Sequence, residues 1–426
     1  MLVQLFLIGC LIAGLFYFAV ARRRLDTFTV AFFSAAMYFL PGFVGYTLTP
    51  VTPEHPVKTP VALDPEAMAI MLLVLASIPL CAVLWDQFDL RRAGPQFRIR
   101  CTPTVSYVAL GLGVLGFLWA VAETGPALFS PDKRDVIGIV GRGHLLWEMG
   151  AAMGAVFAYS YRQRLVLMAS AALLIVDMWI GFRYAFAMAF IGVAWLALWR
   201  DGAFRLSSLP RRYLLAILLG GLAIISYQNL KEPVRQGDWT EVSRRLGDPA
   251  WYAAGVMTSE PFTTQTVLNE VVRNDFRTSS EHLWSASLHL IVFSPSLGAE
   301  GVRFNQLHQA ALFPTVDHGL ADNIWAQMWS ATGWTGLTVF VLIYNLVLAA
   351  GAKGLRCADP ALRAGLVLLF AYWCFYIHRN ELMVQVGYMK QVMILWFSCV
   401  VVTNLLDRAA KVTRGEATKA LRHAIR

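Results

Sequence analysis

Long apolar runs separated by short basic loops are the feature that most limits how this chain can fold. Each run approaches the roughly 20 residues that a helix needs to cross a bilayer, and a helix satisfies its own backbone hydrogen bonds inside lipid. With 57% hydrophobic and only 15% charged residues, the chain also carries too much apolar surface for one aqueous core. We therefore predict an all-α integral membrane protein.

The run lengths predict about eleven transmembrane helices. They cover residues 1–20, 28–48, 67–84, 104–122, 145–159, 165–180, 184–199, 214–227, 335–352, 365–377 and 382–405. Lys and Arg gather in alternate short loops, which is the positive-inside pattern and explains the net charge of +9 without nucleic acid. Arginines 22–24 follow the first run instead of preceding it, so we expect a retained helix rather than a cleaved signal. The N-terminus is then periplasmic and the C-terminus cytoplasmic.

The predicted organisation has four parts. Helices one to eight occupy residues 1–229, a large outer loop occupies 230–334, three more helices occupy 335–406, and a basic cytoplasmic tail follows at 407–426. A loop this long among short ones is typical of a functional region. Within the loop, residues 283–293 and 321–332 are apolar but too short to span, so we expect short interfacial helices. All histidines except His423 lie on the outer side in this topology, where we expect any chemistry.

Two segments resemble a known family. IGFRYA (residues 180–185) places an arginine after a very short hairpin, and DNIWAQMWSATGWTG (322–336) has a polar pair, an apolar stretch and Gly-x-x-Gly before the next span. Both are similar to segments of the bacterial O-antigen polymerases (oligosaccharide repeat-unit polymerases) and the related O-antigen ligases. The layout of many spans with one large late outer loop is similar too. Where the ligases carry a His before Asn323, this chain has Asp322, which favours a polymerase.

The resemblance implies a membrane glycosyltransferase of the bacterial inner membrane. Such an enzyme polymerises undecaprenyl-pyrophosphate-linked oligosaccharide repeat units on the periplasmic face and builds O-antigen or a similar surface polysaccharide. Its partners are lipid-linked glycans as donor and acceptor, the lipid bilayer, a chain-length regulator and a flippase. An O-antigen ligase remains an alternative, as does a lipid-linked oligosaccharide flippase or transporter without catalysis. A transporter should carry polar residues along a pathway to both faces, whereas the charges within the predicted spans are few.

The implied reaction needs a base for the acceptor hydroxyl and cations for the leaving pyrophosphate. His318 and Asp322 are the candidate bases, and their four-residue spacing places them on one face if the segment is helical. The candidate pyrophosphate ligands are Arg142, Arg183, Arg273, Arg303 and Arg379. Lys390 and Asp177 lie within predicted spans and are expected to face a cavity, although Lys390 could instead face a partner. Plainer interpretations are loop ion pairs, snorkelling charges and, for Asp322, a helix N-cap.

The sequence gives no sign of a catalytic metal. Asp-x-Asp pairs, which often hold a divalent cation in sugar transferases, are absent, and Asp132 and Asp135 are interrupted by Lys133 and Arg134. We therefore expect metal-independent chemistry without a cofactor, in which arginines take the place of the cation.

Overall fold

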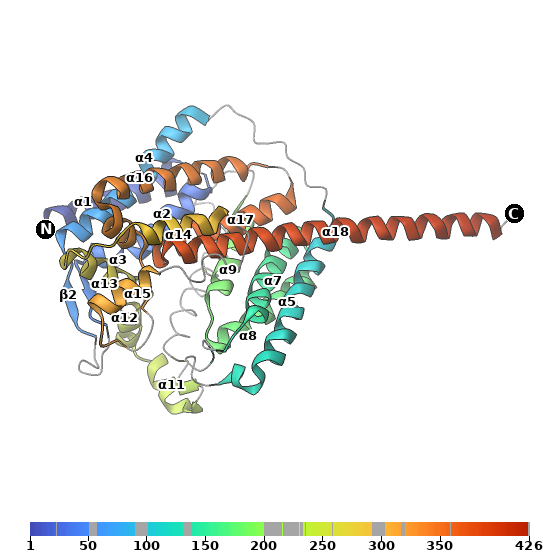
Figure 1. Ribbon diagram of the computed structural model, residues 1–426, viewed down its shortest axis with the longest axis horizontal. Coiled ribbons are helices and arrows are strands. Elements are labelled where there is room, and N and C mark those ends of the chain that lie inside the picture. Colours follow the sequence, from blue (N-terminus) through green and yellow to red (C-terminus); the bar gives the residue numbers. More distant parts are fainter. Residues whose placement is uncertain are drawn as a thin grey trace. The chain divides into compact units, whose positions relative to one another are not determined.

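The computed structural model is almost entirely helical (Figure 1). It describes residues 1–22, 24–50, 58–89, 101–130, 136, 139–199, 215, 230, 233–234, 236–257, 259–291, 303–316, 320–357 and 359–424. The chain forms two compact units. The first comprises Met1–Arg92, Arg200–Ala352 and Trp373–Gly387, and the second comprises Ala93–Trp199, Lys353–Tyr372 and Tyr388–Arg426. The predicted four-part division follows membrane topology and stays a prediction.

The first unit contains the N-terminal helices, a two-stranded antiparallel sheet and the helices of the large loop. Its elements are α1 (Leu2–Phe16), the π-helix η1 (Tyr17–Ala21), α2 (Thr27–Tyr38), α3 (Leu40–Val44), β1 (Tyr46–Leu48), β2 (Pro60–Ala62), α4 (Pro65–Asp89), α11 (Trp239–Leu246), α12 (Pro249–Met257), α13 (Glu260–Arg273), α14 (Glu281–Ile291), α15 (Phe304–Leu312), α16 (Ile324–Gly354) and the 3-10 helix η4 (Tyr376–Arg379).

The second unit is a helical bundle. Its elements are α5 (Thr104–Thr124), the 3-10 helix η2 (Gly125–Phe129), α7 (Arg142–Ser160), α8 (Arg164–Ile180), α9 (Tyr184–Leu198), most of α17 (Pro360–Cys374) and most of α18 (Leu382–Ala424). Helices α5, α7 and α8 pack side by side (Figure 1). Small residues allow this: an added Cβ at Gly116 would lie 2.2 Å from the backbone nitrogen of Trp147, so α5 and α7 approach closely.

Six helices within the described residues are long and apolar enough to cross a bilayer. They are Leu2–Ala21, Pro65–Phe88, Thr104–Phe129, Ile324–Gly354, Pro360–Arg379 and Leu382–Thr413. Helices α2 and α9 are also apolar but shorter, and the predicted span at 214–227 lies outside the described residues apart from Leu215. The chain is thus a predominantly α-helical membrane protein, and the number of eleven spans stays a prediction.

The second predicted span is wrong as a single helix. Instead of one helix over 28–48, the chain forms α2, leaves helical geometry at Phe39 (φ −92°, ψ 13°), and continues through α3 into β1. Pro41 lies in the first turn of α3, where its missing N–H costs nothing, but in the interior of a long helix it would remove a hydrogen bond. The break therefore follows from the proline.

Helical segments form at both places where the sequence predicts them in the large loop, and their interfacial position stays a prediction. The first is α14, and the second is the opening segment of α16, which continues into the following span across a kink at Gly333. Gly333 adopts φ 64° and ψ −164°, a conformation that is strained for any residue with a Cβ. Helix α16 therefore consists of a buried N-terminal segment and a long apolar helix that differ in direction at Gly333.

Helix α13 holds the large loop against the N-terminal elements of the first unit. It packs against α2, α3, α4, β1 and α15. Thr47 of β1 donates to the Phe262 carbonyl at 2.7 Å, and the Thr266 hydroxyl donates to the Leu48 carbonyl at 2.6 Å. The Asn269 side chain accepts from the backbone N–H of Asp64 at 2.7 Å. These bonds satisfy buried polar groups and hold α13 in place.

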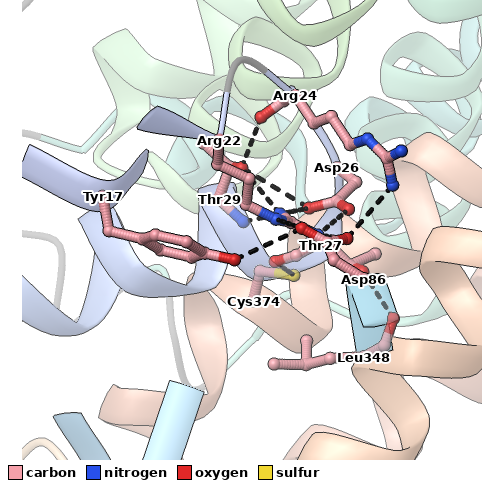
Figure 2. A network of polar contacts seen from close by, with 9 residues as sticks. All are labelled: Tyr17, Arg22, Arg24, Asp26, Thr27, Thr29, Asp86, Leu348 and Cys374. Carbon is pink, nitrogen blue, oxygen red and sulfur yellow. Dashed lines mark hydrogen bonds and ion pairs between the residues drawn. The ribbon is translucent and has the colours of Figure 1, made fainter. Parts of the chain in front are cut away.

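A buried arginine joins three helices of the first unit (Figure 2). Arg22 follows η1, and its side chain is only 1% exposed. It donates two hydrogen bonds to Asp26 at 2.6 and 2.7 Å, and its Nε donates to Asp86 on α4 at 2.8 Å. Asp26 also caps α2 by accepting from the backbone of Thr29. The bidentate geometry offsets the cost of burying charge, so Arg22 is part of the core as well as of the basic loop.

Candidate active site

The Asp322 carboxylate faces α15 rather than capping its own helix. Asn323 is the residue that caps α16, because its Oδ1 accepts from two N–H groups of the first turn at 3.0 and 3.1 Å. Asp322 Oδ1 instead accepts from Asn305 Nδ2 at 3.1 Å and lies 3.1 Å from His308 Nε2. The Asp322 side chain is 13% exposed. A ligand can therefore reach Asp322, whereas His308 is fully buried.

His308 is held entirely inside this group. Its side chain has no exposed surface, and its ring packs against Phe304 and Phe313 with centroid separations of 4.9 and 6.1 Å. Asn305 and His308 are three residues apart on α15 and therefore share a helix face. One face of α15 thus presents two polar groups to Asp322.

Glu381 brings a second carboxyl group to the same place. It lies between η4 and α18, and its Oε2 accepts from the backbone N–H of Asn305 at 3.2 Å, near the N-terminus of α15. The pKa of Glu381 is raised to about 7, first by burial and then by the neighbouring Asp322 carboxylate, while hydrogen bonds from the α15 backbone N–H groups and the charge of Arg303 oppose the rise. A carboxyl group with this pKa exchanges protons at neutral pH.

Contacts between α13, α16 and α18 fix these residues. The Asn323 side chain donates to the Thr264 carbonyl on α13 at 3.3 Å. Gln327 accepts from the backbone N–H of Leu382 at 2.7 Å, which ties α16 to the start of α18 directly after Glu381. Trp325 donates to His378 Nδ1 at 3.1 Å. The segment that begins at Asp322 therefore supplies both this carboxylate and the contacts that position Glu381.

A second histidine borders the group. His282 on α14 stacks on Phe304 with a centroid separation of 5.9 Å and an interplanar angle of 23°. Burial lowers its pKa below the ordinary value, so the neutral imidazole is favoured.

The other predicted site residues of the first unit lie in different surroundings. His318 lies outside the described residues. Arg303 is exposed at the start of α15 and lowers the pKa of Glu381, so it borders the group. Arg273 is exposed in the last turn of α13. Arg379 forms an ion pair with Glu260 on α13, and its guanidinium lies 5.2 Å from the Tyr376 ring centroid.

The remaining predicted site residues belong to the second unit. Arg142 is exposed at the first residue of α7. Arg183 is half-buried directly before α9, in a hairpin where Gly181 takes φ 123°. Asp177 is fully buried and lies 2.8 Å from His144 Nε2. Lys390 is buried on α18, with 6% of its surface exposed.

Comparison with known proteins adds no relative: no family model, no curated protein and no solved structure matches this chain.

Three residues of the group were not predicted from the sequence: Asn305, His308 and Glu381. Asn305 and His308 carry a weak signal, because a polar pair at i and i+3 marks one face of a short helix. Glu381 lies in a charged turn between two apolar spans, which is a stronger signal. Neither signal reveals that the two segments meet at Asp322.

Proposed function

We propose that this chain is a membrane glycosyltransferase that polymerises undecaprenyl-pyrophosphate-linked oligosaccharide repeat units. The observation that carries the proposal is the grouping of Asp322 with Glu381 and His308. Asp322 comes from the segment that resembles the O-antigen polymerases, and the group lies at the ends of apolar helices. We place this group on the periplasmic face of the inner membrane, in a chain of about eleven spans with a cytoplasmic C-terminus.

The proposed reaction forms one glycosidic bond and breaks one bond to phosphate. The acceptor hydroxyl oxygen attacks the reducing-end carbon of the growing glycan, and the bond from that carbon to the pyrophosphate oxygen breaks. The pyrophosphate leaves with the bonding electron pair. Asp322, the most exposed of the three groups, takes the hydroxyl proton, while Asn305 and His308 orient its carboxylate.

Glu381 holds a proton close to this base. Because the pKa of Glu381 is about 7, a part of this group stays protonated at neutral pH, which limits the build-up of negative charge beside Asp322.

Arginines supply the charge that the leaving pyrophosphate needs. Arg303 borders the carboxyl group of Glu381, and Arg379 is partly exposed with 31% of its side chain accessible. A guanidinium binds phosphate oxygens through paired hydrogen bonds, so these residues suit a lipid pyrophosphate without requiring a catalytic metal. Arg142, Arg183 and Arg273 are further proposed ligands.

The test is the length distribution of surface polysaccharide, seen as a gel ladder, in cells lacking this gene. Complementation uses the wild type, Asp322→Asn, Arg183→Ala and the matched control Glu281→Gln, an exposed carboxylate at the start of α14. We expect single repeat units on the lipid cores of the deletion strain. The wild type and the control should restore the ladder, and the two site variants should not.

Other outcomes identify the alternatives. Lipid cores without any glycan, with long chains left on undecaprenyl pyrophosphate, would indicate an O-antigen ligase. Lipid-linked single units accumulating on the cytoplasmic side would indicate a flippase, and a ladder restored by Asp322→Asn would remove Asp322 from the reaction.

A further inference from the structure

The second unit holds a compact group of three potential metal ligands. His144 and Glu148 lie on α7, Asp177 lies on α8, and one donor atom of each falls within 4.8 Å of the other two. His144 Nε2 is 2.8 Å from Asp177 Oδ1 and 3.6 Å from Glu148 Oε1. All three side chains are buried; Glu148 is 1% exposed and Asp177 is 0% exposed.

The local structure positions these side chains. His144 and Glu148 are four residues apart on α7, so they project from one face toward α8. The Tyr184 hydroxyl donates to Glu148 Oε2, which leaves Oε1 directed at His144. The His144 ring also packs against Phe182, with centroids 4.3 Å apart. Residues from α7, α8 and the hairpin before α9 therefore fix the three donors.

One potential ligand atom in this group has no hydrogen-bond partner in the described part of the chain. Glu148 Oε1 is buried and accepts no hydrogen bond from any described residue. A buried carboxylate oxygen without a donor is costly, and a second carboxylate close by raises that cost. A divalent cation would satisfy Oε1 and neutralise both carboxylates at once.

The two separations measured from His144 Nε2 also suit a metal ion. Zinc binds imidazole nitrogen and carboxylate oxygen at about 2.0–2.2 Å, so two donors on a tetrahedron lie about 3.3 Å apart. The separations of 2.8 and 3.6 Å bracket that value. A metal ion would take the place of the proton that lies between His144 Nε2 and Asp177 Oδ1. An imidazole with two carboxylates favours a first-row transition metal over magnesium.

We propose that His144 Nε2, Glu148 Oε1 and Asp177 Oδ1 bind one Zn²⁺ ion, with a fourth position open to water. The ion would fasten the hairpin that carries Arg183. Backbone N–H groups of Gly181 and Phe182 already donate to the Asp177 carbonyl at 3.1 Å, so fixing Asp177 fixes the hairpin. The site is separate from the Asp322 group and does not depend on the proposed glycosyl transfer.

Metal content of the purified full-length chain in detergent tests the proposal. The chain is stripped with a chelator, reloaded with Zn²⁺ or Co²⁺, passed through a desalting column and measured by elemental analysis and visible absorption. We expect about one ion per chain, with a Co²⁺ spectrum of nitrogen and oxygen ligands without thiolate. His144→Ala and Asp177→Asn should lose this ion.

His308→Ala is the matched control, because it removes a buried histidine that also contacts an aspartate but lies in the first unit. It should keep the ion. Tyr184→Phe removes only the hydrogen bond to Glu148, and we expect affinity to fall about 10- to 100-fold because the hydroxyl orients a ligand.

The wild type decides the question even if the ligand variants do not fold. A reloaded wild type that retains no Zn²⁺ or Co²⁺ overturns the proposal, and the three groups then share a proton instead. Retention of the ion in His144→Ala or Asp177→Asn also overturns it, because the ion would then be bound elsewhere.

Discussion

The Nε2 atom of His308 lies 3.1 Å from Oδ1 of Asp322, although 14 residues separate the two in sequence. The His308 side chain is fully buried, whereas Asp322 retains some exposure. Under the proposed function this difference gives them different roles: Asp322 meets the substrate, and His308 acts through Asp322.

The first prediction separates those roles. Asp322→Asn keeps the shape but removes the charge, and we expect polymerisation to slow by about 10²- to 10⁴-fold, the usual contribution of a general base. His308→Gln keeps a donor toward Asp322 and should reduce the rate less. Polymerisation of purified lipid-linked repeat units measures both. A larger loss for His308→Gln than for Asp322→Asn would contradict this assignment.

The second prediction concerns pH and Glu381. Its pKa rises from the ordinary 4.5 in the unfolded chain to about 7 in the folded protein, because burial disfavours the charged form. Between these values the unfolded chain releases a proton that the folded protein retains, so the free energy of unfolding falls as pH rises. Above pH 7 the loss in free energy of unfolding caused by ionised Glu381 is constant, at about 3 kcal/mol.

Glu381→Gln removes this cost and can still accept from the Asn305 backbone. We therefore expect the variant to exceed the wild type in thermal unfolding midpoint at about pH 8 and to lose that advantage at about pH 4. The measurement is thermal unfolding in detergent, with Glu281→Gln as the control that should follow the wild type. An advantage that is equal at both pH values would exclude titration of Glu381 as the cause.

The sequence predicted individual helices better than it predicted their meeting points. Residues 104–122 and 184–199 were expected as helices, and the structure has Thr104–Thr124 and Tyr184–Leu198. Such segments can be predicted from the sequence because an apolar run specifies a helix locally. The failure at 28–48 also has a local cause, since Pro41 cannot donate the backbone hydrogen bond that the interior of one long helix requires.

The residues of the candidate site could be predicted only in part, for a different reason. Asp322 stood out in the sequence, but its partners come from α15 and from the turn before α18, and only packing brings those segments together. The capping role expected as a plainer alternative for Asp322 belongs to Asn323. Asp177 was expected to face a cavity; the structure buries it 2.8 Å from His144 Nε2, and its role stays a prediction. Pairings between distant segments are not encoded in local periodicity.

The third prediction compares two arginines that contact the same aspartate. Arg22 is buried between Asp26 and Asp86, whereas Arg24 is 30% exposed and, among the described residues, pairs with Asp86 alone. Arg22→Met leaves two carboxylates without their main partner and should destabilise the protein by about 3–5 kcal/mol. Arg24→Met should cost only about 0–1 kcal/mol. Thermal unfolding in detergent measures both, and equal effects would show that burial does not control the strength of this network.

The fourth prediction tests whether Arg379 serves phosphate or only Glu260. The pair is partly exposed on both sides, at 31% and 26%, so either single variant should change stability by only about 0.2–1 kcal/mol. If Arg379 binds pyrophosphate, Arg379→Gln should reduce polymerisation strongly while Glu260→Gln should not, because the second variant removes the ion pair and keeps the guanidinium that binds phosphate. Steady-state rates against donor concentration measure this. Similar losses for both variants would assign Arg379 to structure alone.

The fifth prediction uses two glycines of α5 as a matched pair. An added Cβ at Gly116 would lie 2.2 Å from the Trp147 backbone nitrogen, whereas one at Gly111 would meet nothing within 4 Å. Both changes to alanine gain helix propensity, by about 1 kcal/mol each. At Gly111 nothing opposes that gain, so Gly111→Ala should leave stability unchanged or raise it.

At Gly116 the new methyl group must push α7 away, and overpacking of this kind costs about 1–3 kcal/mol. We therefore expect Gly116→Ala to lower the thermal midpoint although the same substitution five residues earlier does not. Because backbone rather than a flexible side chain blocks the methyl group, the cost cannot be relieved by a rotamer change. A Gly116→Ala variant as stable as Gly111→Ala would mean that α5 and α7 do not approach as closely as the structure places them.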